Sequence, residues 1–151
     1  MPSVAVDTRF GTLCVTEDDG AIVRLTWADD THDAATALLR EAVAQIRAYE
    51  AGELKVFDLP LAVRGNDFQK AVCAQMSAIP FGETRTYGDI AKALGHPAQA
   101  VGQACGRNPI AVVIPCHRVM GARGLTGFSG GEGVETKVQL LIHEKAGGFL
   151  I

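Results

Sequence analysis

The chain has 151 residues, of which 48% are hydrophobic and 21% charged, the balance of a soluble globular protein. This length suits one ordinary domain or two small ones. No apolar run approaches the roughly 20 residues that span a bilayer, which excludes a membrane-spanning protein. The N-terminus shows neither a basic start nor a long apolar stretch, so we expect no signal peptide and a cytoplasmic location.

The net charge of −3 argues against general attraction to nucleic acid, but the charge is unevenly distributed. Residues 1–63 hold 5 Lys and Arg against 11 Asp and Glu, whereas residues 64–151 hold 9 against 6. The second half is therefore mildly basic. That is compatible with phosphate contact, and equally with an ordinary solvated surface.

The first sixty residues are predicted to form a small α/β domain. Strands are expected at 3–7, 11–16 and 20–27, with a hairpin turn at Asp18-Asp19-Gly20. A helix is expected from Thr31 to Ala51, ended by Gly52. Its apolar residues recur at helical spacing: Leu38, Ala42, Val43, Ile46 and Tyr49. We find no catalytic constellation in this domain.

A linker near residues 59–65 is expected to lead into a second, mainly helical domain at 61–151. Asp67 is a candidate N-cap for a helix whose apolar stripe is Phe68, Val72, Met76 and Ile79. A capping box at Thr86–Asp89 precedes a short helix that ends at Gly95. Another short helix is expected from Pro97 to about Cys105, and the pair predicts a helix-turn-helix. Two core helices without DNA contact remain an equally good interpretation of this pattern.

The β-branched run from Ile110 to Ile114 is typical of a buried strand, and it leads directly into Cys116. A glycine-rich loop follows, and a helix from about Val134 to Lys145 closes the chain. Its expected inner face comprises Val134, Val138, Leu141 and Ile142.

Cys116 differs from the other three cysteines in its setting. It follows a proline and precedes a histidine and an arginine, and a nearby base or cation helps a thiol to become a nucleophilic thiolate. A cysteine is more often a small buried hydrophobe, so this setting alone leaves both roles open. No Cys-x-x-Cys pair or other metal spacing occurs, so we expect no zinc site.

The hexapeptide Ile114-Pro115-Cys116-His117-Arg118-Val119 resembles the active-site motif of the O6-alkylguanine-DNA alkyltransferases. Further blocks resemble that family in its order: residues 64–69, 79–84, Thr86-Tyr87, Arg107-Asn108-Pro109 and residues 127–131. The resemblance runs from about Arg64 to Gly147, and more loosely over the first domain. It implies an α+β protein with a small ribonuclease-H-like α/β domain and a winged-helix-like domain that contains the helix-turn-helix.

The resemblance also implies irreversible transfer of an alkyl group from O6 of guanine in DNA to Cys116, with O4-alkylthymine left open as a second substrate. Each molecule would act once, because a thioether is stable. No metal or redox cofactor is implied. The partner would be double-stranded DNA, bound in the minor groove with the target base flipped out of the stack. We expect a monomer.

Roles carry over residue by residue. Cys116 would be the nucleophile, His117 a base acting through water, Glu144 the group that orients His117, and Asn108 the support of the active-site turn. Tyr87 would donate to N3 of the guanine. The base would also be held by Val119, Phe128 and Ser129. DNA contacts fall on Thr86, Ala98, Gln99, Ala100 and Gly102.

Gln99 departs from the family, which usually has an arginine there to fill the gap left by the flipped base. Glutamine brings no charge and no guanidinium stacking. Two other functions stay open: a damage-binding relative with weak or no transfer, and a Cys–His hydrolase with turnover. Cys116 argues against the first, and no acyl-substrate feature supports the second.

Overall fold

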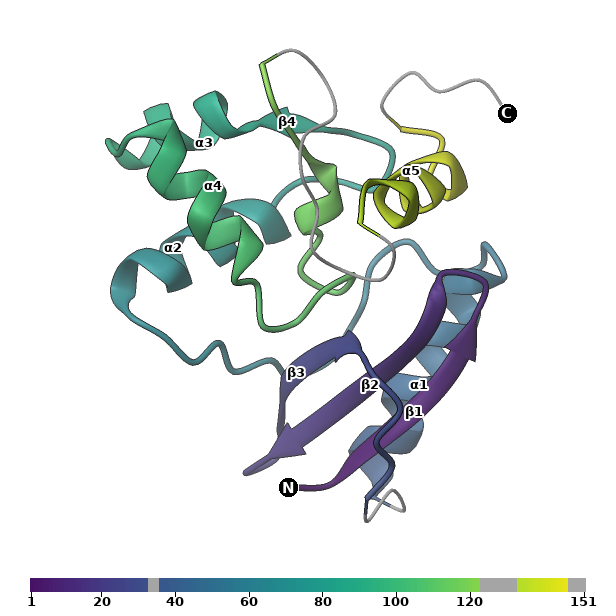
Figure 1. Cartoon of the computed structure of the whole chain (residues 1–151). Helices are drawn as coiled ribbons and strands as arrows, with labels where there is room; N and C mark the ends of the chain where they lie inside the picture. Colours follow the sequence, from purple (N-terminus) through teal and green to yellow (C-terminus); the bar gives the residue numbers. More distant parts are fainter. Residues whose placement is uncertain (33–35, 123–132, 147–151) are drawn as a thin grey trace.

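The computed structural model describes residues 1–32, 36–122 and 133–146. A three-stranded sheet with one helix against it forms the lower part of the molecule in Figure 1, and the other helices gather above it. The α+β class expected from the sequence is confirmed. Among the described helices, none is both long and apolar enough to cross a membrane.

The sheet is an antiparallel meander in the order β1-β2-β3. Its strands are β1 (Ser3–Thr8), β2 (Gly11–Asp18) and β3 (Ala21–Trp27), close to the expected ranges. Asp19 and Gly20 connect β2 to β3 with φ of 51° and 78°, and Asp18 pairs with Ala21. Two consecutive positive φ values match the right-handed twist of the strands, so the predicted hairpin turn is confirmed.

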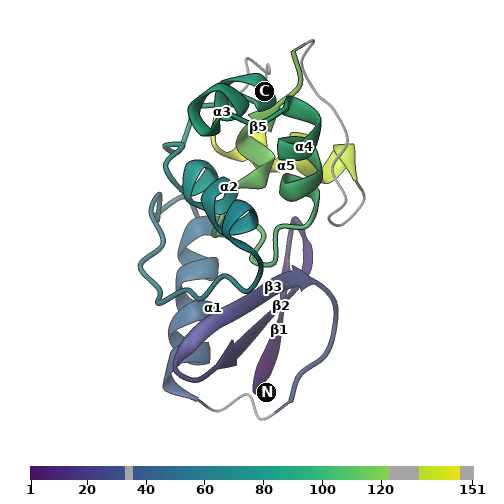
Figure 2. The same ribbon diagram turned by 90° about the vertical axis from the view of Figure 1, so that its left-hand side faces the viewer.

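Helix α1 (Ala37–Glu50) packs against one face of this sheet (Figure 2). It begins later than the predicted Thr31, because the Thr36 side chain caps it by accepting from Leu39 N at 3.1 Å. Its buried residues are Leu39, Ala42, Ile46 and Tyr49, at spacings of three and four. Tyr49 is only 1% exposed, and it faces the second half of the chain.

The described parts of the second half contain four further α-helices. They are α2 (Asp67–Ser77), α3 (Tyr87–Leu94), α4 (Ala98–Gly106) and α5 (Val134–His143). The N-cap of α2 is Asn66 rather than the predicted Asp67, since the Asn66 side chain accepts from Gln69 N at 2.8 Å. The capping box of α3 is present as predicted, and Gly95 ends that helix at φ 70°.

The predicted strand at 110–114 is wrong. Only Ile110 forms a β-bridge, to Leu25, and the chain then turns, with Ile114 N donating to Ile110 O at 2.9 Å. Val112 adopts φ 68°, a rare conformation for a β-branched residue. The run is buried as predicted, but burial of apolar residues does not require a strand. Bonds within the turn, to Leu25 and to Asn108 satisfy several of its polar backbone groups.

The same turn joins the two halves of the molecule. Leu25 N donates to Pro109 O at 2.9 Å, and Ala111 N donates to Leu25 O at 3.0 Å. Nearer the start of β3, Ile22 pairs with Leu61 in the same way. The edge of β3 therefore holds the segment that leads to Cys116. Buried apolar residues of both halves form one continuous core, and the expected boundary at residues 60/61 stays a prediction.

The inner face of the closing helix α5 matches the predicted one only in part, since Leu141 is buried and Val138 and Ile142 are half-buried. Its buried residues are Thr136, Lys137, Leu140 and Leu141, whereas Val134 is 42% exposed. The prediction counted apolar residues only. A lysine can lie on the buried face because Lys137 has a partner of its own there, the carbonyl of Val119.

Candidate active site around Cys116

Cys116 begins a single turn of 3₁₀ helix, η1 (Cys116–Arg118), instead of ending a strand as expected. The strand β5 (Val119–Met120) follows and pairs in parallel with β4 (Arg85–Thr86). In a strand, neighbouring side chains alternate between faces, whereas a tight helical turn fans them out. His117 and Arg118 are both buried on the inner side of this turn.

Cys116 is 8% exposed and lines a cavity of about 690 Å³. The cavity lies between β3 and the C-terminal end of α4. Residues from both halves line it, including Arg24, Thr26, Trp27, Tyr87, Cys105, Asn108 and Ala111. Tyr87 and Asn108 therefore line the same cavity as Cys116, and the N-terminal sheet adds a wall that the sequence did not indicate.

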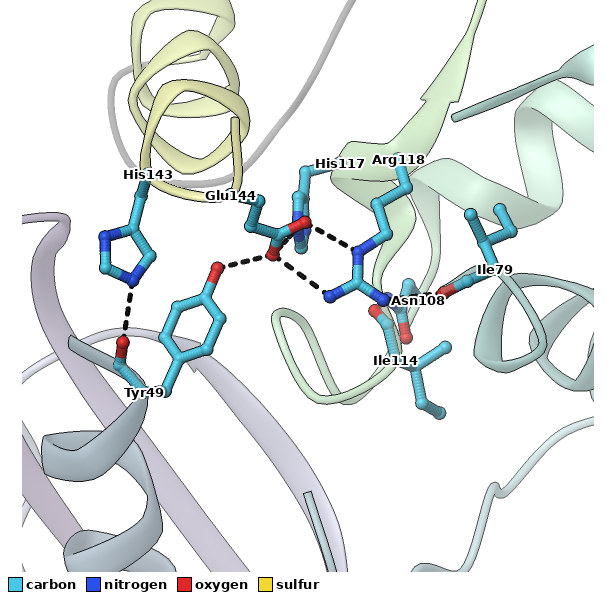
Figure 3. Close-up of polar contacts among 8 residues, drawn as sticks. All are labelled: Tyr49, Ile79, Asn108, Ile114, His117, Arg118, His143 and Glu144. Atoms are coloured by element: carbon cyan, nitrogen blue, oxygen red, sulfur yellow. Dashed lines mark hydrogen bonds and ion pairs between the residues drawn. The ribbon is translucent and has the colours of Figure 1, made fainter. Parts of the chain in front are cut away.

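Asn108 holds the turn that carries Cys116. Its amide nitrogen donates to Ile114 O at 2.7 Å, and its amide oxygen accepts from Ile110 N at 3.0 Å. These two bonds close the turn that contains the strained Val112. Figure 3 draws Asn108 beside Ile114. Backbone strain of this kind persists only where surrounding contacts hold it, and it is common at functional sites.

His117 and Glu144 form a buried pair. The Nε2 atom of His117 lies 2.7 Å from Oε2 of Glu144, and both side chains are inaccessible to solvent. Arg118 completes the group, with Nε donating to Oε1 of Glu144 at 2.7 Å and Nη2 to Oε2 at 3.1 Å. Its Nη1 donates to Ile79 O at 2.6 Å (Figure 3). The guanidinium of Arg118 thus binds both oxygens of the Glu144 carboxylate, which fixes the orientation of the carboxylate.

The protonation states follow from this geometry. Burial alone would raise the pKa of the Glu144 carboxyl, but the hydrogen bonds from His117 and Arg118 and the charge of Arg118 bring the pKa well below its usual value. Glu144 is therefore an acceptor only, and the proton of neutral His117 resides on Nε2. Burial lowers the pKa of His117, which keeps the ring neutral. Its Nδ1 is buried and has no hydrogen-bond partner among the described residues.

Nδ1 of His117 is therefore a basic nitrogen to which no described residue donates a hydrogen bond. Burial raises the pKa of the Cys116 thiol, while Asn108 and Lys137 oppose that rise. The thiol therefore needs a base to become a nucleophile at neutral pH. The adjacent neutral imidazole, oriented by a carboxylate, has the chemistry to accept that proton directly or through one water.

Lys137 is a functional candidate that the sequence analysis missed. It is completely buried, its Nζ donates to Val119 O at 2.6 Å, and the ammonium lies 6.0 Å from the centre of the Tyr87 ring. Burial lowers its pKa, whereas the nearby thiols of Cys116 and Cys105 act in the opposite direction. Its spacing from Leu141 and Glu144 placed it on the inner face of α5, and that signal was available in the sequence.

The remaining predicted residues fall into two groups. Val119 is buried at the start of β5, with its carbonyl bound by Lys137. Phe128 and Ser129 lie outside the described residues. Within the described parts of the chain, no three His, Cys, Asp or Glu side chains are placed to hold a metal ion together.

The helix-turn-helix formed by α3 and α4 presents small side chains outward. Ala98 and Gln99 are exposed, Ala100 and Gly102 are half-buried, and Val101, Ala104 and Cys105 face the core. A Cβ built on Gly102 would meet nothing within 4 Å, so the fold itself does not require glycine there. Thr86 caps α3, with its hydroxyl accepting from Asp89 N at 3.0 Å.

Acid is expected to destabilise this protein through the buried pair. The pKa of the Glu144 carboxyl is lower in the folded than in the unfolded protein. Its contribution to the free energy of unfolding is therefore complete above about pH 4.5 and is lost as the pH falls below that value. His117, whose pKa is also lowered, adds to the loss from its ordinary value of 6.5 downward. Urea unfolding at a series of pH values from 7 to 3.5 should show falling stability, with a slope of up to about 1.4 kcal/mol per pH unit for each proton. A wild-type stability that does not change with pH would contradict the pairing of an ionised Glu144 with a neutral His117.

Comparison with known proteins gives consistent matches. The sequence profile described as "6-O-methylguanine DNA methyltransferase, DNA binding domain" matches residues 67–146. A methylated-DNA–protein-cysteine methyltransferase of Mycolicibacterium paratuberculosis is 44% identical over 150 residues, covering 93% of this chain and 90% of that protein. One from Methanosarcina acetivorans is 58% identical over 95 residues, 61% of each chain. The crystal structure of Mycobacterium tuberculosis OGT in complex with DNA has 40% sequence identity and a TM-score of 0.85, covering 98% of this chain and 96% of that one.

Proposed function

Because the chain belongs to the methylated-DNA–protein-cysteine methyltransferase family, we propose that it repairs O6-alkylguanine in DNA by moving the alkyl group onto its own Cys116. The observation that carries the proposal is the placement of Cys116 on one cavity with Tyr87, next to a buried His117–Glu144 pair. This expectation from the sequence thus has support from relatives along nearly the whole chain.

In the proposed reaction, Nδ1 of His117 takes the thiol proton of Cys116 through a water, and Glu144 stabilises the imidazolium that forms. The thiolate sulfur attacks the alkyl carbon, so that an S–C bond forms while the O6–C bond breaks. The electron pair of the broken bond passes to the guanine, which takes up one proton for the one lost by the thiol. No step consumes the thioether product, so each molecule acts once.

Tyr87 is proposed to donate its hydroxyl proton to N3 as charge builds on the departing base. The carbonyls of Cys116 and Val119 are proposed to accept from the exocyclic amine. Val119 O already accepts from Lys137, but a carbonyl oxygen has two lone pairs and can accept twice. Lys137 thereby holds the carbonyl in place and brings a positive charge toward the thiolate.

We propose that α4 lies in the minor groove of duplex DNA and that the damaged base is flipped into the cavity beside Cys116. The small side chains of Ala98, Ala100 and Gly102 would permit close approach of α4 to the duplex, and Gln99 would fill the gap that the base leaves. Thr86 lies at the start of α3 next to Tyr87. A monomer suffices for this arrangement, since every proposed group comes from one chain, and a cytoplasmic location stays a prediction.

Substituting Gly102 with alanine is expected to separate stability from DNA binding. The free energy of unfolding should rise by about 0.5–1 kcal/mol, because glycine in a helix interior is costly and the new Cβ meets nothing. Affinity for duplex DNA should fall, because the added methyl group holds the helix away from the groove. Urea unfolding and fluorescence anisotropy with a labelled duplex measure the two effects. Unchanged or higher affinity would contradict the minor-groove placement.

The proposed function is tested by repair of a duplex in which O6-methylguanine blocks a restriction site. The wild type should restore cutting in proportion to the protein added, with a plateau at one repaired site per molecule. Repair beyond that ratio would indicate turnover, as a hydrolase would show. Binding in a mobility assay without any restored cutting would place the chain among proteins that bind damage without removing it.

A further inference from the structure

The N-terminal half reaches the proposed catalytic group through one hydrogen bond. The hydroxyl of Tyr49, at the end of α1, lies 2.6 Å from Oε2 of Glu144, which is 95 residues away in sequence. Tyr49 is 1% exposed and Glu144 is 2% exposed. Figure 3 shows the tyrosine approaching the carboxylate from the side opposite to Arg118.

Tyr49 must be the donor in this bond. Burial and the neighbouring Glu144 raise the pKa of its hydroxyl far above the ordinary value, so the phenol stays protonated. Oε2 of Glu144 thus accepts from Tyr49, from Nε2 of His117 at 2.7 Å and from Nη2 of Arg118 at 3.1 Å. The tyrosine and the histidine therefore bind the same oxygen, and a change in one bond alters the other.

A second contact prevents Tyr49 from moving away. His143, which precedes Glu144, has its Nε2 2.7 Å from the backbone oxygen of Tyr49, and its ring lies against the tyrosine ring at 4.9 Å. Arg9 fixes the tautomer, because its Nη2 donates to Nδ1 of His143 at 2.6 Å and leaves Nε2 as the donor. Consecutive residues at the end of α5 are thus both bound to one residue of α1.

We propose that Tyr49 is a positioning residue for alkyl transfer, through which the N-terminal domain holds Glu144 against His117 and limits how strongly the carboxylate attracts the imidazole proton. This inference rests on the proposed function. Each donor on Oε2 withdraws negative charge from it, so removal of the hydroxyl leaves Glu144 more basic. A more basic Glu144 stabilises the protonated form of His117, in which Nδ1 can no longer accept the thiol proton.

The other charged groups around the His117–Glu144 pair are not changed by a substitution of Tyr49. Arg118 faces Glu144 from η1, Lys137 acts on His117 from α5, and Arg9 acts on Tyr49 from the turn after β1. The hydroxyl itself donates its hydrogen bond to Glu144, and the charges of Arg9 and Arg118 act on Tyr49 from a distance. Tyr49→Phe therefore changes one donor on Glu144 while it retains the aromatic packing against Phe57, Phe81 and His143.

The test compares single-turnover transfer rates of the wild type, Tyr49→Phe and Arg9→Gln between pH 5 and 9, with a duplex that carries one O6-methylguanine. Arg9→Gln is the matched control, because it loosens the same interface without touching Glu144. We expect Tyr49→Phe to slow transfer about tenfold at neutral pH, the equivalent of about 1.4 kcal/mol. The acid limb of its profile should also move to higher pH, while Arg9→Gln keeps the wild-type limb.

A purely structural role predicts a different result. Loosening of the interface would lower the rate by the same factor at every pH, and Arg9→Gln would behave like Tyr49→Phe. Either that result or a Tyr49→Phe profile that coincides with the wild type would overturn the inference and leave the proposed function intact. A wild type that transfers nothing would overturn both.

Discussion

Replacing Glu144 with glutamine is expected to lower the free energy of unfolding by about 3–5 kcal/mol at neutral pH. The substitution leaves the guanidinium of Arg118, which is 7% exposed, without its carboxylate in the protein interior. It also weakens the bonds that Oε2 accepts from His117 and Tyr49. Urea unfolding at pH 7 measures the loss, and the acid dependence of stability should flatten at the same time.

The control for this prediction is Glu135→Gln. Glu135 lies in the first turn of the same helix and is exposed, so its loss should cost no more than about 1 kcal/mol through the helix dipole. Equal effects of the two substitutions would mean that the buried carboxylate does not hold Arg118. A stable Glu144→Gln protein with unchanged transfer would contradict both its structural and its catalytic role.

The second large effect is expected from His117→Gln. Transfer at neutral pH should slow by about 10²- to 10⁴-fold, the range that a positioned general base contributes. The thiol of Cys116 has a raised pKa, so without the imidazole its thiolate forms only in alkaline solution. The rate of the variant should therefore continue to rise with pH after the wild-type rate has levelled off.

His32→Gln is the matched control for that experiment. His32 is exposed, and its backbone pairs with Ser3 at the edge of the N-terminal sheet, away from Cys116. Rapid-quench measurement of transfer across the pH range gives both profiles. A His117→Gln variant that reacts at the wild-type rate would remove His117 from the proton path and would leave Asn108 or Lys137 as the groups that act on the thiol.

Much of the fold could be predicted from the sequence because its signals are local. The strands of the N-terminal sheet follow the alternation of side chains, and the turn at Asp19-Gly20 follows from the residues that tolerate positive φ. The capping box and Gly95 likewise mark the ends of α3 within a few residues. Local rules failed at Ile110–Ile114, where the apolar residues are buried by neighbours distant in sequence and Asn108 replaces strand partners.

The candidate site was predictable only in part. The motif around Cys116 indicated the nucleophile and its histidine, and the structure places Glu144 on that histidine as the family resemblance implied. Lys137 and Tyr49 were missed for physical reasons. A buried lysine resembles a surface lysine in sequence, and Tyr49 looked like one more apolar residue of α1. Helical spacing places Lys137 on one face with Leu141 and Glu144, but it does not record the contacts to Val119 and Glu144 that give Lys137 and Tyr49 their roles.

The most direct test of the central claim is the intact mass of the protein after incubation with a duplex that carries one O6-methylguanine, compared with Cys116→Ala. We expect that the wild type gains one methyl group and no more, that peptide mapping locates it on Cys116, and that the variant binds the duplex without gaining mass. A methyl group on another residue, or a wild type that leaves the duplex methylated and its own mass unchanged, would contradict the account.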